Sequence, residues 1–251
     1  MTSKNVNPVS DTRKKELFLF IEKLNIGEIY LEKIQTRSDN FISIFNEALT
    51  HTSANQLFNH EKLEFLGDAV LRLTASEFIE KNFSSMQVGE RSALRSQLVS
   101  DEWLTKVGKS ILIEKVLLVG PKASRDLSAI ATFQAEATEA VIGALYQCLK
   151  DFKPIHKWLN PYWEKESKIV LADPHRNNSK SALQEWSQGR GLMLPTYEIQ
   201  ELTKIHGSAE RFFCKVKLEG IAIAEGWGGS RKEAEKKAAK YALEYLNQIK
   251  E

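Results

Sequence analysis

The chain has 251 residues, which is long enough for one large domain or two ordinary ones. Lys and Arg number 35 against 33 Asp and Glu, so the net charge of +2 argues only weakly for a nucleic-acid partner and the distribution of charge must decide. The absence of a long apolar run argues against a membrane span, and two separated cysteines, Cys148 and Cys214, exclude a cysteine zinc site and are expected to be buried thiols.

The first part of the chain is expected to be helical. Residues 1–12 are polar and lack the apolar core of a signal peptide, so we expect a disordered tail there. From that point to about residue 164, apolar residues recur every three or four positions, which predicts helices throughout. One such stripe runs from Leu17 to Leu24 and another from Phe41 to Leu49.

Residues 60–71 read HEKLEFLGDAVL and place three carboxylates in an apolar helix. Glu61, Glu64 and Asp68 stand at positions i, i+3 and i+7, within an arc of about 60° on a helix of 3.6 residues per turn. Like charges on adjacent turns repel each other, and the one cation in this stretch, Lys62, points elsewhere. A solvated face normally mixes both signs and is wider. The narrow acidic arc therefore favours a site for a hard divalent cation over an ordinary solvated face.

A second acidic pair lies on a helix expected over residues 130–149. Glu136 and Glu139 stand at i and i+3, beside the apolar stripe. Four carboxylates could converge on one ion if the two helices approach closely, and the spacing alone leaves open the alternative of two exposed glutamates. The small residues that would allow this approach are Gly67, Ala69, Ala140 and Gly143.

The pattern changes after Trp163. Residues 165–178 are polar and aperiodic and contain Asp173-Pro174, so they are interpreted as an interdomain linker. Beyond the linker the periodicity predicts a helix, three strands and a second helix. The expected elements are a helix over 181–188, strands over 195–202, 212–218 and 221–227, and a tight turn at 219–220 that joins the last two strands.

The last helix is expected to start at a capping box formed by Ser230 and Glu233, directly before two cations. Exposed amides, the helix dipole and these cations together make a phosphate site. Basic runs on terminal helices are usually only solvated, so this interpretation depends on the rest of the module. The basic stripe consists of Arg231, Lys232 and Lys236, and an opposite stripe expected to pack on the sheet consists of Ala234, Ala238, Tyr241 and Tyr245.

Several motifs of the helical region resemble those of ribonuclease III, the double-stranded-RNA endonuclease. Residues 60–71 are similar to the family signature NERLEFLGDSVL, with His60 in place of Asn and Lys62 in place of Arg. Residues 136–144 read EATEAVIGA and resemble the second family motif, D-x-x-EALIGA, with Glu136 in place of Asp. The sequences ALTHTS, which includes His51, and VGER, at residues 88–91, resemble further family motifs in the expected order.

The C-terminal region resembles a double-stranded RNA-binding domain. Residues 183–198 resemble its N-terminal part and residues 229–239 resemble its last helix. Together the resemblances imply an all-α catalytic domain with the ribonuclease III endonuclease fold, followed by a small α+β domain with α-β-β-β-α order. The expected division is a disordered tail at 1–12, the catalytic domain at 13–164, the linker at 165–178 and the double-stranded RNA-binding domain at 179–249.

The resemblance also assigns roles to the acids. In the family, the corresponding carboxylates hold Mg²⁺ and organise the hydrolytic water, with Asp68 and Glu139 as the catalytic pair. Glu61 resembles a residue that shapes the cleavage groove and is given a supporting role. The extra methylene of Glu136 fits the octahedral coordination of Mg²⁺ poorly, so we expect slower turnover or a shift toward Mn²⁺. The implied metal ligands are Glu64, Asp68, Glu136 and Glu139.

Two kinds of partner are implied as well. Ribonuclease III domains are homodimers, and Phe65 matches the aromatic residue that inserts into the partner; the alternative is a phenylalanine in this chain's own core. Double-stranded RNA is read by shape, through the minor groove and the phosphates. Glu235, where many such domains have a lysine, would weaken this binding. The implied RNA contacts are Gln184, Glu185, His206, Arg231, Lys232 and Lys236.

The expected function is therefore that of a Mg²⁺-dependent, cytoplasmic endoribonuclease. It would cleave double-stranded RNA to 5′-phosphate and 3′-hydroxyl ends during the processing of rRNA or mRNA precursors. The alternative is an RNA-binding protein in place of an enzyme: a catalytically weak or inactive double-stranded RNA-binding dimer, in which the fold serves for dimerisation. Retention of carboxylates at all four acidic positions favours the enzyme.

Overall fold

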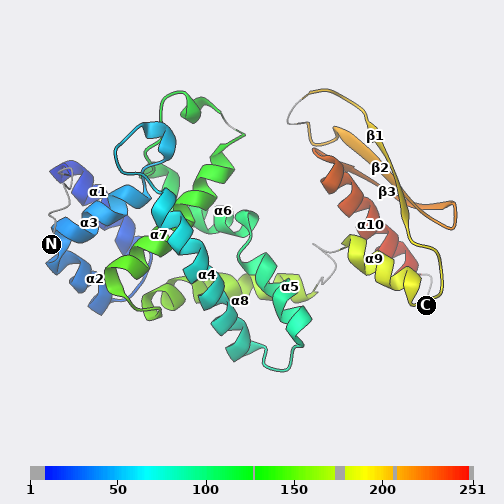
Figure 1. Cartoon of the computed structure of the whole chain (residues 1–251), viewed down its shortest axis with the longest axis horizontal. Coiled ribbons are helices and arrows are strands. Elements are labelled where there is room, and N and C mark those ends of the chain that lie inside the picture. The colour runs from blue at the N-terminus through cyan, green and yellow to red at the C-terminus, as the bar shows by residue number, and fades with distance from the viewer. Residues whose placement is uncertain (1–8, 127, 173–178, 206–207, 249–251) are drawn as a thin grey trace. The chain divides into compact units, whose positions relative to one another are not determined.

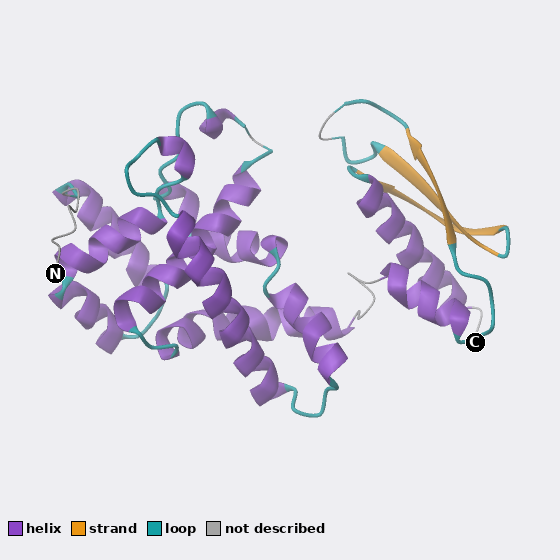
Figure 2. Ribbon diagram, in the orientation of Figure 1, coloured by secondary structure: helices purple, strands orange, loops and turns teal. Residues whose placement is uncertain are grey.

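The structure is a computed structural model of the chain, and it describes residues 9–126, 128–172, 179–205 and 208–248. The chain divides into two compact units, Met1–Lys168 and Ile169–Glu251. Within the described residues, the first unit consists of helices and their connections, whereas the second combines helices with a sheet (Figure 2).

The helices up to α8 build the first unit, and α8 itself continues past the division between the units. Three short 3-10 turns, η1 to η3, lie in the connections. The bounds are α1 Asp11–Lys23, α2 Glu28–Thr36, α3 Ser38–Ala48, η1 Thr52–Ala54, α4 Glu61–Asn82, α5 Val88–Leu98, α6 Asp101–Ser110, η2 Ile113–Lys115, η3 Ala123–Arg125, α7 Ile130–Leu149 and α8 Lys153–Ala172.

Helices α4 and α7 pack directly on each other (Figure 1), and two glycines set the distance between them. A Cβ on Gly67 would lie 1.9 Å from the carbonyl oxygen of Glu139, and a Cβ on Gly143 would lie 2.0 Å from the carbonyl oxygen of Leu63. Both distances are far below van der Waals contact, so only glycine fits at either position. The close approach expected from the small residues is therefore present, and it brings the two acidic pairs toward each other.

Helix α8 extends further than the sequence pattern predicts. It continues to Ala172, so residues 165–172 of the predicted linker are helical, and the division between the two units falls after Lys168, within that linker. Trp163, Ser167 and Val170 are all buried, and their spacing of i, i+4 and i+7 places them on one helix face. A serine in the middle of this buried stripe interrupts the apolar pattern, which is why the helix was not expected there.

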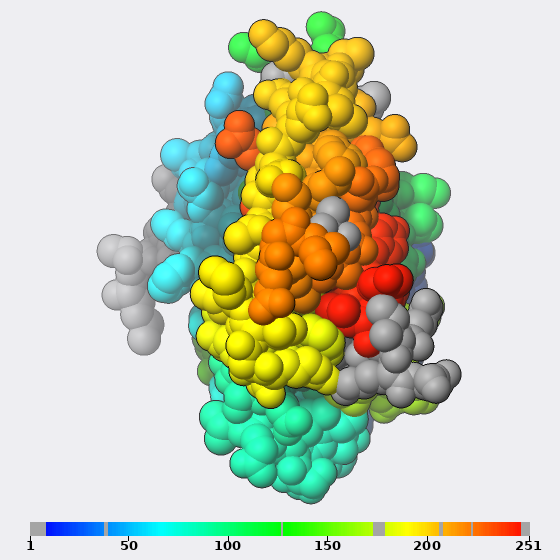
Figure 3. Space-filling model, turned by 90° about the vertical axis from the view of Figure 1, so that its right-hand side faces the viewer, coloured from blue at the N-terminus to red at the C-terminus, as the bar shows by residue number. Residues whose placement is uncertain are grey.

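The second unit is a three-stranded sheet with α10 packed against one face and α9 beside α10. The sheet is antiparallel in the order β1-β2-β3, and Figure 3 views this unit with the strands, in gold and orange, in front of much of α10. The expected tight turn is formed by Glu219 and Gly220, which have φ of +50° and +81°. The bounds are α9 Ser179–Gln188, β1 Thr196–Glu201, β2 Phe212–Leu218, β3 Ile221–Gly228 and α10 Arg231–Gln248.

The core of the second unit lies between α10 and the inner face of the sheet. A Cβ on Gly226 of β3 would lie 2.4 Å from the backbone nitrogen of Ala238, so the strand and the helix are in close contact. Alternate residues of β2 face this core, as the sequence predicts. The buried β2 residues are Phe212, Cys214, Val216 and Leu218.

The predicted buried face of α10 is only partly confirmed: Ala234 and Ala238 are buried, but the two tyrosines are not. Tyr241 and Tyr245 are 47% and 51% exposed, whereas Ala239 and Ala242 are buried. Ala238, Ala239 and Ala242 mark the centre of the buried face of α10. The two tyrosines lie at the edge of this face.

The predicted fold class is confirmed: a helical unit is followed by a unit of α-β-β-β-α order. Cys148 and Cys214 are buried free thiols, as expected. Among the described residues, the helices are too short or too polar to cross a lipid bilayer.

Candidate metal centre and nucleic-acid interface

The four predicted metal ligands line one cavity of about 490 Å³. Glu64 and Asp68 extend into it from α4, and Glu136 and Glu139 extend into it from α7. The glycine contacts between the two helices are what allow acids from separate segments to meet. The remaining residues of the cavity wall are His51, Thr52, His60, Glu61 and Phe65.

Burial and mutual repulsion raise the pKa of three of these carboxyls. The pKa of Glu139 is raised to about 7, first by burial and then by the charges of Asp68 and Glu64. Burial and the charge of Glu61 raise the pKa of Glu64, and burial and the charge of Glu64 raise the pKa of Glu136. Negative charge is therefore gathered here with little compensation, and a bound cation would relieve it.

A cation that the sequence pattern did not reveal as part of the site is paired with Asp68. Arg72, one turn further along α4, places its Nε 2.7 Å and 2.9 Å from the two carboxylate oxygens of Asp68. The two side chains are 56% and 41% exposed, so water screens the pair and its net contribution is small. A metal ion bound by Asp68 would have to compete with Arg72. The arginine lies just beyond the signature motif, at the i+4 position typical of helical ion pairs.

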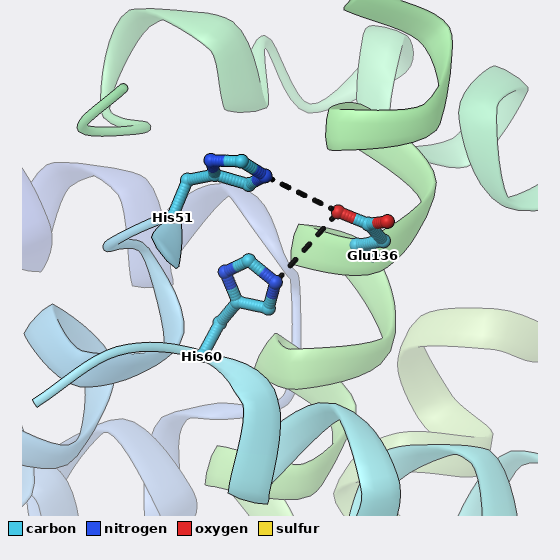
Figure 4. Close-up of side chains that lie close together, drawn as sticks. All are labelled: His51, His60 and Glu136. Atoms are coloured by element: carbon cyan, nitrogen blue, oxygen red, sulfur yellow. Dashed lines mark ion pairs between the residues drawn. The ribbon is translucent and has the colours of Figure 1, made fainter. Parts of the chain in front are cut away.

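Two buried histidines in the cavity wall were not among the predicted site residues. Their ring nitrogens point toward the carboxylate of Glu136, and one donor atom from each of the three residues lies within 4.8 Å of the others (Figure 4). Nε2 of His51 is 3.6 Å and Nε2 of His60 is 3.7 Å from Oε2 of Glu136. Nε2 of His60 is also 3.1 Å from Oε2 of Glu64. The i, i+4 spacing of His60 and Glu64 is the sequence signal that could have revealed this contact.

His51 is held between other rings. Its ring centroid lies 4.2 Å from that of Phe133 and 5.0 Å from that of His60. Burial, together with the neighbouring His60, lowers the pKa of His51. The imidazole of His51 is therefore mostly neutral at physiological pH.

Glu61 and Phe65 lie at the margin of the cavity. Glu61 is exposed, and its charge contributes to the raised pKa of Glu64. Phe65 is 84% exposed. This exposure excludes the alternative that Phe65 belongs to the chain's own core, and it leaves the aromatic ring available to a partner.

The predicted RNA contacts of the second unit lie on two helices. Gln184 and Glu185 are exposed on α9, and Arg231 and Lys232 are exposed at the start of α10. Lys236 is half-buried one turn further along α10. His206 lies outside the described residues.

The expected cap of α10 is formed, with one difference. Oγ of Ser230 accepts a hydrogen bond from the backbone N–H of Glu233 at 3.2 Å. The carboxylate of Glu233 accepts from the N–H of Gly229, at 2.9 Å, instead of from that of Ser230. The first turn of α10 therefore starts next to the basic residues, as the phosphate-site prediction requires.

Glu235 of α10 forms an ion pair with Lys180. Its Oε2 lies 2.5 Å from Nζ of Lys180 on α9, and its side chain is 21% exposed. The expected weakening of RNA binding by Glu235 is therefore reduced, because Lys180 neutralises the carboxylate.

Comparison with known proteins identifies the family of each unit. The family model described as Ribonuclease-III-like matches residues 39–151, and the model of the double-stranded RNA binding motif matches residues 179–246. Ribonuclease 3 of Prochlorococcus marinus is 53% identical over 98% of this chain and 99% of its own length. Ribonuclease 3 2 of a Nostoc species is 39% identical over 78% of this chain and 81% of its own. The chain therefore belongs to the ribonuclease III family of endoribonucleases.

Proposed function

We propose that this chain cleaves double-stranded RNA with Mg²⁺ bound in the cavity between α4 and α7. The observation that carries the proposal is the convergence of four carboxylates from two helices in one cavity, next to the exposed Phe65. The double-stranded RNA binding motif at residues 179–246 supports a duplex substrate. In this proposal the products have 5′-phosphate and 3′-hydroxyl ends.

The residues present fit a divalent cation. The donor atoms are hard oxygens, which Mg²⁺ prefers. Burial and neighbouring acids raise the pKa of Glu139 to about 7, and this rise reflects the cost of holding these charges together without a cation. Glu64, Asp68, Glu136 and Glu139 would hold the ion. When bound, the ion would lower the pKa of attacking water and screen the charge of the phosphate.

The chain's own residues would organise the reaction. Asp68 and Glu139 orient a water molecule for in-line attack on a phosphodiester. The new bond joins the water oxygen to phosphorus, and the bond from phosphorus to the ribose 3′-oxygen breaks. The water loses a proton as it attacks, and the departing 3′-oxygen takes up a proton to become the 3′-hydroxyl. Arg72 must leave Asp68 for this arrangement, and its 56% exposure gives it room to move. Glu61, at the cavity margin, supports the groove.

The second unit would bind the duplex. Gln184 and Glu185 would reach the minor groove, and the start of α10 would hold phosphates. We also propose that the nuclease unit forms a homodimer through Phe65. This residue matches the family aromatic at the dimer interface, and its side chain is 84% exposed, so the ring is available to a partner. Two sites would then cut the two strands. A role in rRNA and mRNA precursor processing in the cytoplasm completes the proposal.

One pair of observations favours a second candidate function. Glu136 stands where the family motif has Asp, and Asp68 is already engaged by Arg72. Both would weaken catalysis, so the alternative is a double-stranded RNA-binding dimer with little or no cleavage.

Incubation of the purified full chain with a long duplex RNA and Mg²⁺ separates the two functions. The nuclease produces short duplex fragments, and the Glu139→Gln variant, used as the control, produces none. A gel shift without fragments, identical for both proteins, would support the binding protein and overturn the nuclease.

A further inference from the structure

We propose that Nε2 of His60 is a ligand of the same metal ion, so that the site combines one nitrogen with carboxylate oxygens. This inference rests on the proposed function, because it adds a ligand to the metal site assigned there. His60 is 3% exposed and lines the cavity, and its ring points toward Glu136 (Figure 4).

The distances around His60 suit shared coordination. Nε2 of His60 lies 3.1 Å from Oε2 of Glu64 and 3.7 Å from Oε2 of Glu136. Two ligands at right angles on an octahedral ion, with bonds of about 2.1 Å, lie about 3.0 Å apart. The 3.1 Å distance from Nε2 of His60 to Oε2 of Glu64 matches this spacing. The 3.7 Å distance to Oε2 of Glu136 is longer, so the side chain of Glu136 would have to move to join the same ion.

The other ring nitrogen of His60 fixes the tautomer that a metal ligand needs. Nδ1 lies 3.2 Å from the carbonyl oxygen of Thr50, and a carbonyl oxygen only accepts hydrogen bonds, so Nδ1 carries the hydrogen. In the neutral ring the lone pair of Nε2 then faces two carboxylates. This contact is favourable only with a proton or a cation between the atoms. A histidine bound to metal usually donates its second N–H to a carbonyl or carboxylate in this way.

His51 has the opposite tautomer, although it lies in the same cluster. Its Nδ1 accepts a hydrogen bond from the backbone N–H of Ser53 at 3.1 Å. The hydrogen of the neutral ring is therefore on Nε2, which lies 3.6 Å from Oε2 of Glu136 and faces it as a donor. His51 is a positioning residue for Glu136 and not a metal ligand. The two neighbouring histidines are therefore expected to differ: His60 binds the metal ion and His51 does not.

Two of the departures from the family motifs meet at this point. His60 stands in place of Asn and Glu136 in place of Asp, and the longer side chain of Glu136 reaches toward the imidazole. An imidazole ligand favours transition ions over Mg²⁺, whose ligands are oxygens. We therefore expect the affinity for Mn²⁺ relative to Mg²⁺ to depend on His60.

Pulsed electron paramagnetic resonance of Mn²⁺ bound to the full chain tests the inference directly. The wild-type protein should show modulation from a coordinated ¹⁴N. Labelling of the histidines with ¹⁵N should replace this modulation with the ¹⁵N pattern, which tests the assignment without a substitution. The His60→Asn variant should keep bound Mn²⁺ but lose the modulation. The His51→Asn variant, the matched control, should keep it.

Titration calorimetry of the same proteins adds a second measurement. His60→Asn should weaken Mn²⁺ binding about tenfold while changing Mg²⁺ binding much less. Bound Mn²⁺ without nitrogen modulation in the wild-type protein would overturn the role of His60 and leave the carboxylate site standing. Modulation that survives in His60→Asn would also overturn it. Failure of the wild-type protein to bind Mn²⁺ at all would overturn both this inference and the proposed function.

Discussion

The cavity between α4 and α7 and the start of α10 arrange charge in opposite ways. In the cavity, acids gather with little compensation, so that the pKa of Glu139 rises to about 7. At the start of α10, Arg231 and Lys232 are exposed, and a neighbouring cation, Lys237, is paired with Glu233 at 2.8 Å. The first region depends on a backbone distance set by glycines. The second depends on several exposed side chains, each of which contributes little.

The largest expected effect is the loss of cleavage when the charge of Glu139 is removed. Glu139→Gln keeps the size of the side chain but removes a metal ligand, so cleavage should fall at least about 10³-fold. Duplex binding should not change, because the second unit is untouched. Single-turnover cleavage of a labelled duplex and a gel shift in Ca²⁺ measure the two properties separately. An equal loss of both would contradict a purely catalytic role.

The glycine contact is the next most sensitive feature of the cavity. Gly143→Ala would push a Cβ to 2.0 Å from the carbonyl oxygen of Leu63, which forces α4 and α7 apart. We expect the free energy of unfolding to fall by about 3 kcal/mol, as measured by urea denaturation. Gly89→Ala, in α5, is the matched control, since nothing lies within 4 Å of its Cβ position, and it should change stability by less than about 1 kcal/mol. Similar stabilities for the two variants would show that the helices can separate freely.

The raised pKa of Glu139 predicts a dependence on pH. Between the ordinary value of 4.5 and about 7, the folded metal-free protein holds a proton on Glu139 that the unfolded chain has lost. This group therefore makes the metal-free protein less stable as the pH rises through that window. Metal binding requires the ionised carboxylate, so affinity should rise with pH up to about 7.

Calorimetry in two buffers with different ionisation heats measures this linkage. At pH 6, Mn²⁺ binding to the wild-type protein should release protons, and Glu139→Gln should release about one proton fewer. The raised pKa of Glu64 and of Glu136 would account for any release that remains. Equal release by both proteins would assign the titration to other groups.

A smaller effect is expected at the start of α10. Lys232→Gln should weaken binding to duplex RNA only a few-fold and reduce the slope of log affinity against log salt by about 1, because one phosphate contact is lost. Lys217→Gln, in β2, is the control, since Lys217 pairs with Glu198 at 2.5 Å, on the strand face away from α10. Fluorescence anisotropy over a range of salt concentrations provides both quantities. An unchanged slope for Lys232→Gln would remove this residue from the phosphate site.

The smallest effect is expected at Arg72. Arg72→Gln removes a competitor of the metal ion at Asp68, and an exposed ion pair contributes at most about 1 kcal/mol. Mn²⁺ affinity should therefore rise about two- to threefold in calorimetry. Lys62→Gln, on the same helix, should have no effect. Weaker binding by Arg72→Gln would show that the arginine supports the site.

Much of this arrangement could be predicted from the sequence. The spacing of Glu64 and Asp68, and of Glu136 and Glu139, gives two acidic faces, and the small residues beside them explain how the helices meet. Helical spacing is a local property, so it can be read from a short segment.

The features that escaped prediction depend on distant or interrupted patterns. His51 and Glu136 are far apart in the sequence and meet only in the folded chain. The end of α8 was missed because Ser167 interrupts a buried apolar stripe. The tautomers of the two histidines depend on a carbonyl oxygen and on a backbone N–H, and neither interaction can be read from residue types.

An anomalous-scattering map of a crystal soaked in Mn²⁺ shows whether carboxylates from α4 and α7 bind one ion. We expect a peak in the cavity between α4 and α7, within bonding distance of carboxylate oxygens from both helices, with Arg72 displaced from Asp68. A map without a peak there, and with Arg72 still bound to Asp68, would contradict this expectation.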